Sequence, residues 1–535
     1  MPAAKSADLC WGQHHHLLRY QQVPAASRYE AHITTSFPLP AGCTPAHVRA
    51  ALTHLVRRHE VLRTTYDLAA SPFPRQRVAP PAPLPVAEVA TEGTPAPADV
   101  VKDLIQRPFD LGTDWPMRAC VVTTGGELKR LHLVFNHLAF DDVSLDVLAA
   151  DLEALLAGRA EGRPVALEPV EYQPVDLARY EESLDPEADL EHWRVEVTWL
   201  PTDIYAKRRK DSTGAHSASL TSPSLLKIAR ELAARRRVWP SAVHLAAYAV
   251  TMAAYTGEPL IAHRLYTSQR DASGFGSVLT CLSYPTLVAI DLTDDPPFSV
   301  VLSRAAERIE ASIAHAHVPF DRIAEEVSRE SSRRGEEVRV VSEVNFLDNA
   351  PRSCGAKRDR LTWHADPVDW AKAGSDLYFR IYEWADGITL ALQVLDEVMD
   401  RADVEAFLRG YARVVQVHGD GGVDLRASEV ARLVGFGEGL VSGKAGSNRP
   451  QHSRALEAEH ALTSAISSVN ALPAVDPADS YVLAGGRVLR LPRVLEALRE
   501  AGWDGVSLNQ LAGASPLRTL AARLRPAIPE NGADR

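Results

Sequence analysis

The chain has 535 residues, of which 46% are hydrophobic, and a formal net charge of −11. This acidic balance, with no basic domain, argues against nucleic acid as a partner. No apolar run reaches the roughly 18 residues of a membrane span, and the N-terminus lacks a signal peptide's apolar stretch. We therefore expect a globular, cytoplasmic protein of about three or four domains with no membrane contact.

Cysteine and histidine usage predicts neither a disulfide framework nor a metal site. The five cysteines stand at positions 10, 43, 120, 281 and 354, without a CxxC pair. The run His14-His15-His16 invites a metal interpretation. It has no carboxylate or cysteine partner at the spacing that zinc sites use, so we expect no metal there.

A hairpin followed by a helix is the most informative part of the chain. Residues 117–123 (MRACVVT) and 128–135 (LKRLHLVF) are typical of two strands, with Gly125-Gly126 as the turn. Apolar residues at helical spacing predict a helix over residues 143–155. His137 therefore lies where a strand ends in a loop, a place from which a side chain can face a cleft.

Proton transfer is the chemistry that such a histidine allows. The unperturbed pKa of histidine lies near neutrality, so His137 can take a proton from an amine or hydroxyl that attacks a carbonyl. Asp141, four residues later, can orient the loop or form a buried ion pair with an arginine. An HxxxD pattern alone is weak evidence, because His317–Asp321 is a second match. The simpler interpretation is a hydrogen-bonded structural histidine.

The segment Asn136–Asp142 (NHLAFDD) resembles the HHxxxDG signature of condensation domains from nonribosomal peptide synthetases. Further segments match the same family in its own order. They are residues 11–13 (WGQ), 57–66 (RRHEVLRTTY), 172–180 (YQPVDLARY), 239–248 (WPSAVHLAAY), 268–270 (SQR), 317–322 (HVPFDR), 344–346 (VNF) and 376–377 (DL). So many ordered matches are far more specific than one HxxxD pattern.

The resemblance implies an α/β fold of two chloramphenicol-acetyltransferase-like lobes arranged in a V shape. The N-terminal lobe would span residues 1–180 and the C-terminal lobe residues 181–420, with the active site in a tunnel between them. By the same resemblance, His137 is the catalytic residue. Asp141 and Arg270 would form the ion pair that supports the motif loop.

Three departures from the family pattern mark a divergent member. Asn136 replaces the first histidine of the motif, although its amide can still donate and accept hydrogen bonds. Asp142 replaces a glycine, which suggests a left-handed backbone or a close backbone approach there. Its carboxylate would favour a protonated His137 and weaken it as a base. The segment Gly276–Leu282 also lacks the family's asparagine.

The C-terminal region resembles a peptidyl carrier domain that has lost its attachment site. Residues 421–455 are typical of a flexible linker, and residues 456–525 alternate helical stretches with short loops. By the resemblance, Val488 stands where carriers have the serine that accepts phosphopantetheine, and Arg487 replaces the usual acidic residue. We expect a pseudo-carrier domain without a bound cofactor. An unrelated helical bundle is the alternative.

Two basic runs, Lys207–Lys210 and Arg235–Arg237, stand out from the acidic background. The plain interpretation is a solvated loop and a helix end favoured by the helix dipole. The functional interpretation is the docking of an acidic carrier protein.

Together these features predict a stand-alone condensation enzyme of natural-product biosynthesis that acts as a monomer. A partner carrier protein would deliver the donor acyl group as a phosphopantetheine thioester. A free amine or alcohol would be the acceptor, and the product an amide or an ester. Two alternatives remain: an inactive platform that recruits carrier proteins or tailoring enzymes, and an acyltransferase that uses coenzyme A.

Overall fold

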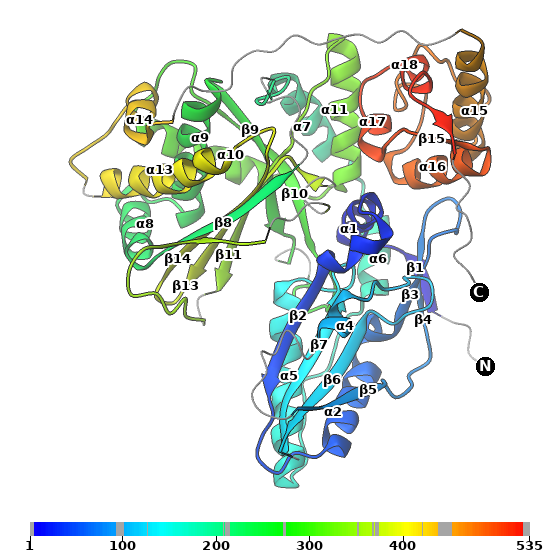
Figure 1. Ribbon diagram of the computed structural model, residues 1–535, viewed down its shortest axis with the longest axis vertical. Coiled ribbons are helices and arrows are strands. Elements are labelled where there is room, and N and C mark those ends of the chain that lie inside the picture. The colour runs from blue at the N-terminus through cyan, green and yellow to red at the C-terminus, as the bar shows by residue number, and fades with distance from the viewer. Residues whose placement is uncertain are drawn as a thin grey trace. The chain divides into compact units, whose positions relative to one another are not determined.

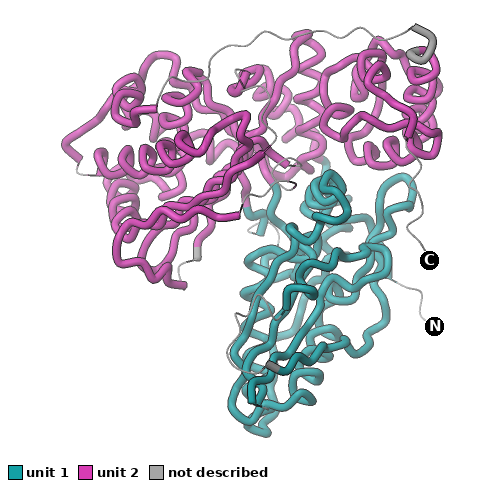
Figure 2. The backbone as a smooth tube through the Cα atoms, in the orientation of Figure 1, with its two compact units in different colours: residues 1–185, 268–284 teal, residues 186–267, 285–535 magenta. Residues whose placement is uncertain are grey.

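The computed structural model describes residues 5–91, 101–125, 127–206, 208, 214–270, 274–349, 352–365, 369, 374–419, 421–436 and 452–527. The α/β chain divides into two compact units (Figure 2): residues 1–185 with 268–284, and residues 186–267 with 285–535. The sequence predicts two continuous lobes, residues 1–180 and 181–420. In the structure, residues 268–284 belong with the first unit, although they lie within the predicted second lobe. No helix among the described residues is long and apolar enough to cross a membrane.

A four-stranded sheet in the order β2-β7-β6-β5 forms the centre of the first unit (Figure 1). The predicted hairpin is present as β6 (Met117–Thr124) and β7 (Glu127–Asn136), which pair antiparallel. β2 (His32–Pro38) pairs antiparallel with β7, and β5 (Val86–Thr91) pairs parallel with β6. β7 is thus held on both sides, which fixes the residue that follows its last position.

Two helices supply most of the apolar core of this unit. They are α2 (Pro45–Arg58) and α5 (Asp142–Glu161), of which α5 contains the predicted helix 143–155. Leu52 and Leu55 of α2 and Leu148 and Leu152 of α5 are fully buried in one cluster with Leu133 of β7. Each such side chain contributes roughly 1.5–3 kcal/mol by leaving water. This packing makes the start of α5 a rigid platform.

Smaller elements complete the first unit. A three-stranded sheet has the order β1-β4-β3, from Lys5–Asp8, Arg75–Val78 and Thr64–Asp67. The helices are α1 (Trp11–Gln22), η1 (Ala25–Ala31), η2 (Glu60–Arg63), α4 (Lys102–Gln106) and α6 (Pro174–Ser183).

A seven-stranded sheet in the order β10-β9-β11-β13-β14-β8-β12 organises the second unit. Its strands are β8 (Ala215–Ser222), β9 (Leu260–Ser268), β10 (Ser283–Asp291), β11 (Ser342–Asn349), β12 (Arg360–Trp363), β13 (Leu377–Trp384) and β14 (Gly387–Leu395). β11 pairs parallel with β9 and β13, whereas β13, β14, β8 and β12 follow one another antiparallel.

Helices pack against this sheet and around its ends. They are α7 (Glu187–Glu196), η3 (Val197–Trp199), α8 (Pro223–Arg236), α9 (Pro240–Thr256), α10 (Phe298–Ala314), α11 (Phe320–Arg334), α13 (Arg401–Gly419) and α14 (Ala427–Val434). The apolar helix α9 is buried nearly throughout, at the centre of the larger core cluster.

The region predicted as a flexible linker, residues 421–455, begins as packed structure. Val430 of α14 is fully buried and belongs to the core cluster of the second unit, and a Cβ at Gly410 would meet Val434 at 2.3 Å. A linker that starts at residue 421 is therefore wrong, because α14 completes the core. Residues 437–451 of that prediction lie outside the described residues.

The C-terminal region forms helices where the sequence predicted them. They are α15 (His452–Asn470), η4 (Val488–Arg490), α16 (Leu491–Glu500), α17 (Leu508–Ala512) and α18 (Leu517–Ala521), with a short β15 (Trp503–Asp504) paired to β16 (Arg525–Pro526). Tyr481 is fully buried, and a Cβ at Gly486 would meet its ring at 2.4 Å, so this position requires glycine.

This bundle packs against α11 within the second unit, and Figure 1 shows α11 beside α17. Ser332 Oγ lies 2.9 Å from Ser480 Oγ, and Ser328 Oγ donates to the carbonyl of Gly513 at 3.5 Å. The contact is polar, as is typical of interfaces between domains of one chain.

Candidate active site

His137 follows directly on the last residue of β7 and is partly exposed. Burial lowers the pKa of His137, and its own backbone hydrogen bond and the charges of Asp142 and Asp141 only partly offset this effect. The imidazole is therefore neutral near neutral pH, the state in which one ring nitrogen can accept a proton. Asp142 raises the pKa of His137, which is the direction predicted from the sequence, but desolvation outweighs this effect.

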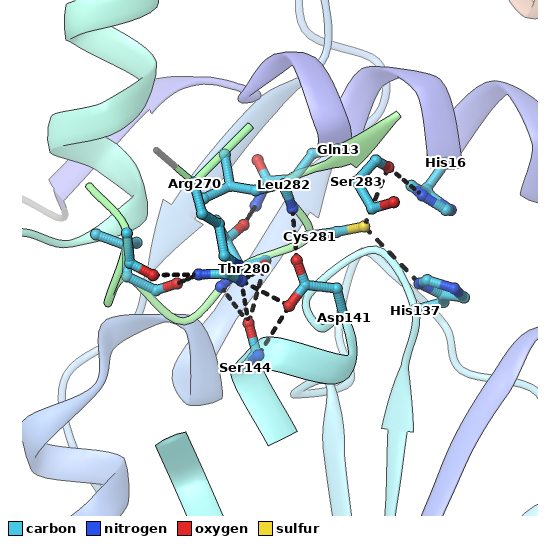
Figure 3. A network of polar contacts seen from close by, with 12 residues as sticks. Gln13, His16, His137, Asp141, Ser144, Arg270, Thr280, Cys281, Leu282 and Ser283 are labelled. Atoms are coloured by element: carbon cyan, nitrogen blue, oxygen red, sulfur yellow. Dashed lines mark hydrogen bonds and ion pairs between the residues drawn. The ribbon is translucent and has the colours of Figure 1, made fainter. Parts of the chain in front are cut away.

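Asp141 connects the motif loop to the segment 268–284, as Figure 3 shows. It caps α5, since its Oδ1 accepts a hydrogen bond from the amide of Ser144 at 2.8 Å. The same oxygen accepts from Arg270 Nη2 at 2.6 Å, and Oδ2 accepts from the amide of Leu282 at 3.0 Å. A carboxylate at a helix N-terminus is also favoured by the helix dipole.

Arg270 fills the centre of this network and is itself buried. Besides Asp141, it donates to Ser144 Oγ at 2.9 Å and to three backbone carbonyls: Gly276 at 2.7 Å, Val278 at 2.9 Å and Thr280 at 3.0 Å. The two terminal nitrogens of Arg270 and both carboxylate oxygens of Asp141 are thus hydrogen-bonded, which favours a buried ion pair. It fixes both the motif loop and residues 276–282, which precede β10.

Asp142 is exposed and is the first residue of α5. Its φ is not positive, so a left-handed backbone, one of the two alternatives that the sequence suggested at this position, is wrong. An acidic side chain in the first turn of a helix is stabilising. The replacement of glycine by aspartate is therefore compatible with the loop.

Asn136 is buried and supports the turn through its side chain and its backbone. Its Oδ1 accepts a hydrogen bond from the amide of Leu138 at 2.9 Å. Its backbone amide donates to the carbonyl of Pro116 at 3.0 Å. The side-chain amide thus shapes the loop that begins with His137, as the sequence allowed.

Two residues beside His137 were not found from the sequence. Cys281 Sγ lies 3.8 Å from His137 Nδ1, and the ring of His16 stacks on that of His137 with centroids 4.3 Å apart. His16 was noticed only as part of a histidine run, and Cys281 carried no signal. The partners come from α1, the end of β7 and the segment 268–284, so only the folded chain brings them together.

The motif Trp11–Gln13 fixes α1 against the Cys281 backbone. A Cβ at Gly12 would lie 2.1 Å from the carbonyl oxygen of Cys281, so this close approach requires glycine. Gln13 Nε2 donates to Thr280 Oγ1 at 3.3 Å, while Gln13 Oε1 accepts from the amide of Cys10 at 2.9 Å. Thr280 thus provides a polar contact in the segment where the family's asparagine is missing.

Glu181 should make the stability of this unit depend on pH. Its Oε2 accepts from the Trp11 amide at 2.8 Å, and burial raises the pKa of its carboxyl from 4.5 to about 8. A raised carboxyl pKa gives stability that is complete below pH 4.5 and is lost as the pH rises towards 8. Glu181→Gln should therefore increase the free energy of unfolding by about a few kcal/mol at pH 8 and by much less at pH 5. The melting temperature should rise accordingly. A difference from wild type that shrinks between pH 5 and pH 8 in thermal melts would contradict this assignment.

The second HxxxD match has a different setting. Asp321 is buried on α11, where burial and the neighbouring Glu325 raise its pKa to about 7. Arg487 Nη2 approaches Asp321 Oδ2 at 3.8 Å, and Arg487 Nε donates to Glu325 Oε1 at 2.8 Å. Asp321 of this second match is thus part of the contact between α11 and the C-terminal bundle, whereas His317 is exposed.

Val488 belongs to the same contact. It is 7% exposed, and its amide donates to Glu325 Oε1 at 3.1 Å. The position that the resemblance assigns to the missing serine therefore faces a buried carboxylate of α11.

The basic runs have structural partners where they are described. Arg208 pairs with Asp203 and Asp376, while Lys207, Arg209 and Lys210 lie outside the described residues. Arg235–Arg237 end α8, as the plain interpretation predicted.

Comparison with known proteins finds relatives among natural-product synthetases. The chain is 28% identical over 298 residues to chondramide synthase cmdD of Chondromyces crocatus, which covers 53% of this chain and 8% of the synthase. The chain thus spans only a small part of that relative.

Among solved structures, the fold resembles that in "Molecular basis for condensation domain-mediated chain release from the enacyloxin polyketide synthase". The TM-score is 0.62 at 17% identity, covering 78% of this chain and 84% of that one. It also resembles the X-domain in its complex with OxyB from teicoplanin biosynthesis, with a TM-score of 0.63 at 22% identity, covering 80% and 96%.

The resemblance inferred from the motifs is therefore confirmed, and so is the mixed α/β fold of condensation-domain structures. The family model described as "Condensation domain" matches residues 22–417, most of the chain. This protein belongs to the condensation-domain family.

Proposed function

We propose that this chain joins an acyl group, delivered as a thioester on a separate carrier protein, to a free amine or alcohol. The observation that carries the proposal is the supported state of His137. The residue is neutral and partly exposed, and it stands at the end of a rigid strand, on a loop fixed by the Asp141–Arg270 pair. Drift without selection would not be expected to keep all three residues together.

The reaction requires one proton to move. His137 accepts it from the attacking amine or hydroxyl, and the nucleophile forms a bond to the thioester carbonyl. The carbon–sulfur bond then breaks, and the carrier's pantetheine thiol takes up the proton as it leaves. Nδ1 of His137 faces Cys281, so Nε2 is the nitrogen left for this exchange. A positioned general base typically contributes about 10²–10⁴-fold, and orientation of the two reactants adds to it.

Val488 supports a free acceptor. We infer that the C-terminal bundle is a pseudo-carrier domain, because a valine has no hydroxyl to which phosphopantetheine could be attached. Its amide is also bonded to Glu325, and the side chain is buried. An acceptor tethered to this domain is therefore not available. The related enacyloxin condensation domain mediates chain release from its polyketide synthase, so a protein of this fold acts in a release step.

Recruitment of another protein is the second candidate function. Asn136 and Asp142 depart from the family motif, and the related X-domain was solved in complex with OxyB. Under this alternative the chain would bind a carrier protein or a tailoring enzyme without turning over the thioester.

Intact-protein mass spectrometry separates the two. A carrier loaded with an acyl thioester is mixed with the wild-type chain and a panel of free amines and alcohols, with His137→Ala as the matched control. Acyl loss that needs both His137 and one class of nucleophile supports the condensation enzyme. Equal acyl loss with both proteins, while a pull-down retains the carrier, supports recruitment. An arm with acyl-coenzyme A instead of the carrier tests the coenzyme A alternative.

A further inference from the structure

Three side chains with metal-binding atoms meet beside the motif loop. His16, His137 and Cys281 each offer one such atom, and these atoms lie within 4.8 Å of one another. Figure 3 shows the sulfur of Cys281 directed towards the two imidazole rings. All three residues belong to the first unit, and His16 and Cys281 are buried.

We propose that His16, His137 and Cys281 bind a divalent cation of the zinc type. A thiolate with two imidazoles is a ligand set that Zn²⁺ favours, and three protein ligands leave a fourth position open. Zn–S and Zn–N bonds of about 2.3 and 2.0 Å place a sulfur and a nitrogen roughly 3.5 Å apart in a tetrahedral site. The observed distance between Cys281 Sγ and His137 Nδ1 is 3.8 Å, close to this requirement.

The hydrogen bond of His16 has the form expected of a metal ligand. Its Nε2 lies 2.9 Å from the carbonyl oxygen of Ser283. An N–H donated to that carbonyl fixes the tautomer and leaves Nδ1 with its lone pair. Histidines that bind metals almost always donate their second ring N–H to a backbone carbonyl or a carboxylate in this way.

Small movements complete the coordination. The rings of His16 and His137 are stacked at 22° and must turn until their lone pairs converge. His137 stands in the short turn between β7 and α5, where a side-chain rotation leaves both elements in place. The charged groups around the cluster are Asp141, Asp142, Arg19 and Arg270, whose formal charges cancel. A thiolate formed at Cys281 on binding therefore supplies the negative charge that faces the cation.

The consequence of metal binding for activity rests on the proposed function, in which His137 accepts the proton of the acceptor substrate. On binding, the Cys281 thiol releases its proton to solvent and its sulfur bonds to the cation. His137 then uses a ring nitrogen and its freedom to rotate for the metal, so it no longer accepts a proton from the acceptor substrate. Zinc would hold the enzyme inactive, and a chelator would restore it.

Cobalt titration of the full-length protein tests the site without any acyl substrate. We expect one equivalent of Co²⁺ to bind and to produce a near-ultraviolet sulfur-to-cobalt charge-transfer band with intense tetrahedral visible bands. One equivalent of Zn²⁺ should displace it. Cys281→Ser should abolish the charge-transfer band. His16→Gln should weaken binding by at least about 100-fold, since the loss of an outer-shell partner alone costs roughly 10–100-fold.

Matched controls separate the site from general thiol or histidine binding. Cys120→Ser removes a buried cysteine of β6 in the same unit, and His15→Gln removes the neighbour of His16. Both should bind cobalt as the wild type does. If Cys281→Ser or His16→Gln fails to fold, as judged by circular dichroism, cobalt binding by the other of these two variants tests the site.

Binding that survives both Cys281→Ser and His16→Gln would overturn the site, as would the lack of a one-to-one complex at micromolar metal. Failure of the proposed function would look different: metal binding would be intact, and the chelated enzyme would show no acyl transfer that depends on His137.

Discussion

Replacing His137 with alanine should lower kcat for acyl transfer by about 10²–10⁴-fold, the usual contribution of a positioned general base. The residue is partly exposed at the end of β7, so the substitution removes little packing beyond the stacking of its ring on His16. The expected result is a loss of turnover with an unchanged melting temperature. Single-turnover acyl loss from a loaded carrier, followed by mass spectrometry in the presence of a chelator, measures it.

A second histidine provides the matched control. His132 lies on β7, five residues before His137, and is buried in the same strand. His132→Gln should retain turnover because its side chain is outside the His137 network. If His137→Ala turns over at the wild-type rate, the proton transfer is not carried by this residue and recruitment becomes the better function. Carrier binding should persist in either case, which a pull-down checks.

Replacing Arg270 with methionine should destabilise the first unit by roughly 3–5 kcal/mol, the cost of leaving one partner of a buried ion pair without the other. Asp141 would remain buried and charged, and the carbonyls of Gly276, Val278 and Thr280 would lose their donor. Denaturant unfolding measures the free energy. Activity should fall as well, because the segment 268–284 would no longer fix the loop of His137.

An exposed arginine provides the matched control, because the same substitution there breaks an ion pair that is not buried. Arg304 makes two hydrogen bonds to Asp294, each 2.8 Å long, and the aspartate is largely exposed. Arg304→Met should cost less than about 1 kcal/mol, as surface ion pairs do. Equal losses for the two variants would show that the Arg270 network does not stabilise the unit. Asp141→Asn with Arg270→Met should recover part of the loss, because the buried charge is then removed.

The local elements were readable from the sequence. The alternation and turn chemistry of residues 117–135 predicted β6 and β7, and the helical spacing after them predicted α5. Those two predictions place His137 at a strand end, because strand and helix periods are properties of adjacent residues. The family assignment came from ordered motifs over several hundred residues. The wrong prediction for Asp142 concerned its left-handed backbone, because α5 begins at this residue.

The sequence by itself determined the hairpin, the strand-end position of His137, the family and the absence of a hydroxyl at Val488, since each of these is a matter of residue type or of short-range spacing. Only the tertiary structure decided that residues 268–284 belong with the first unit, and that His16 and Cys281 stand beside His137. It alone also paired Val488 with Glu325. These contacts join residues more than one hundred positions apart, and packing of whole elements, which no local pattern encodes, brings such residues together.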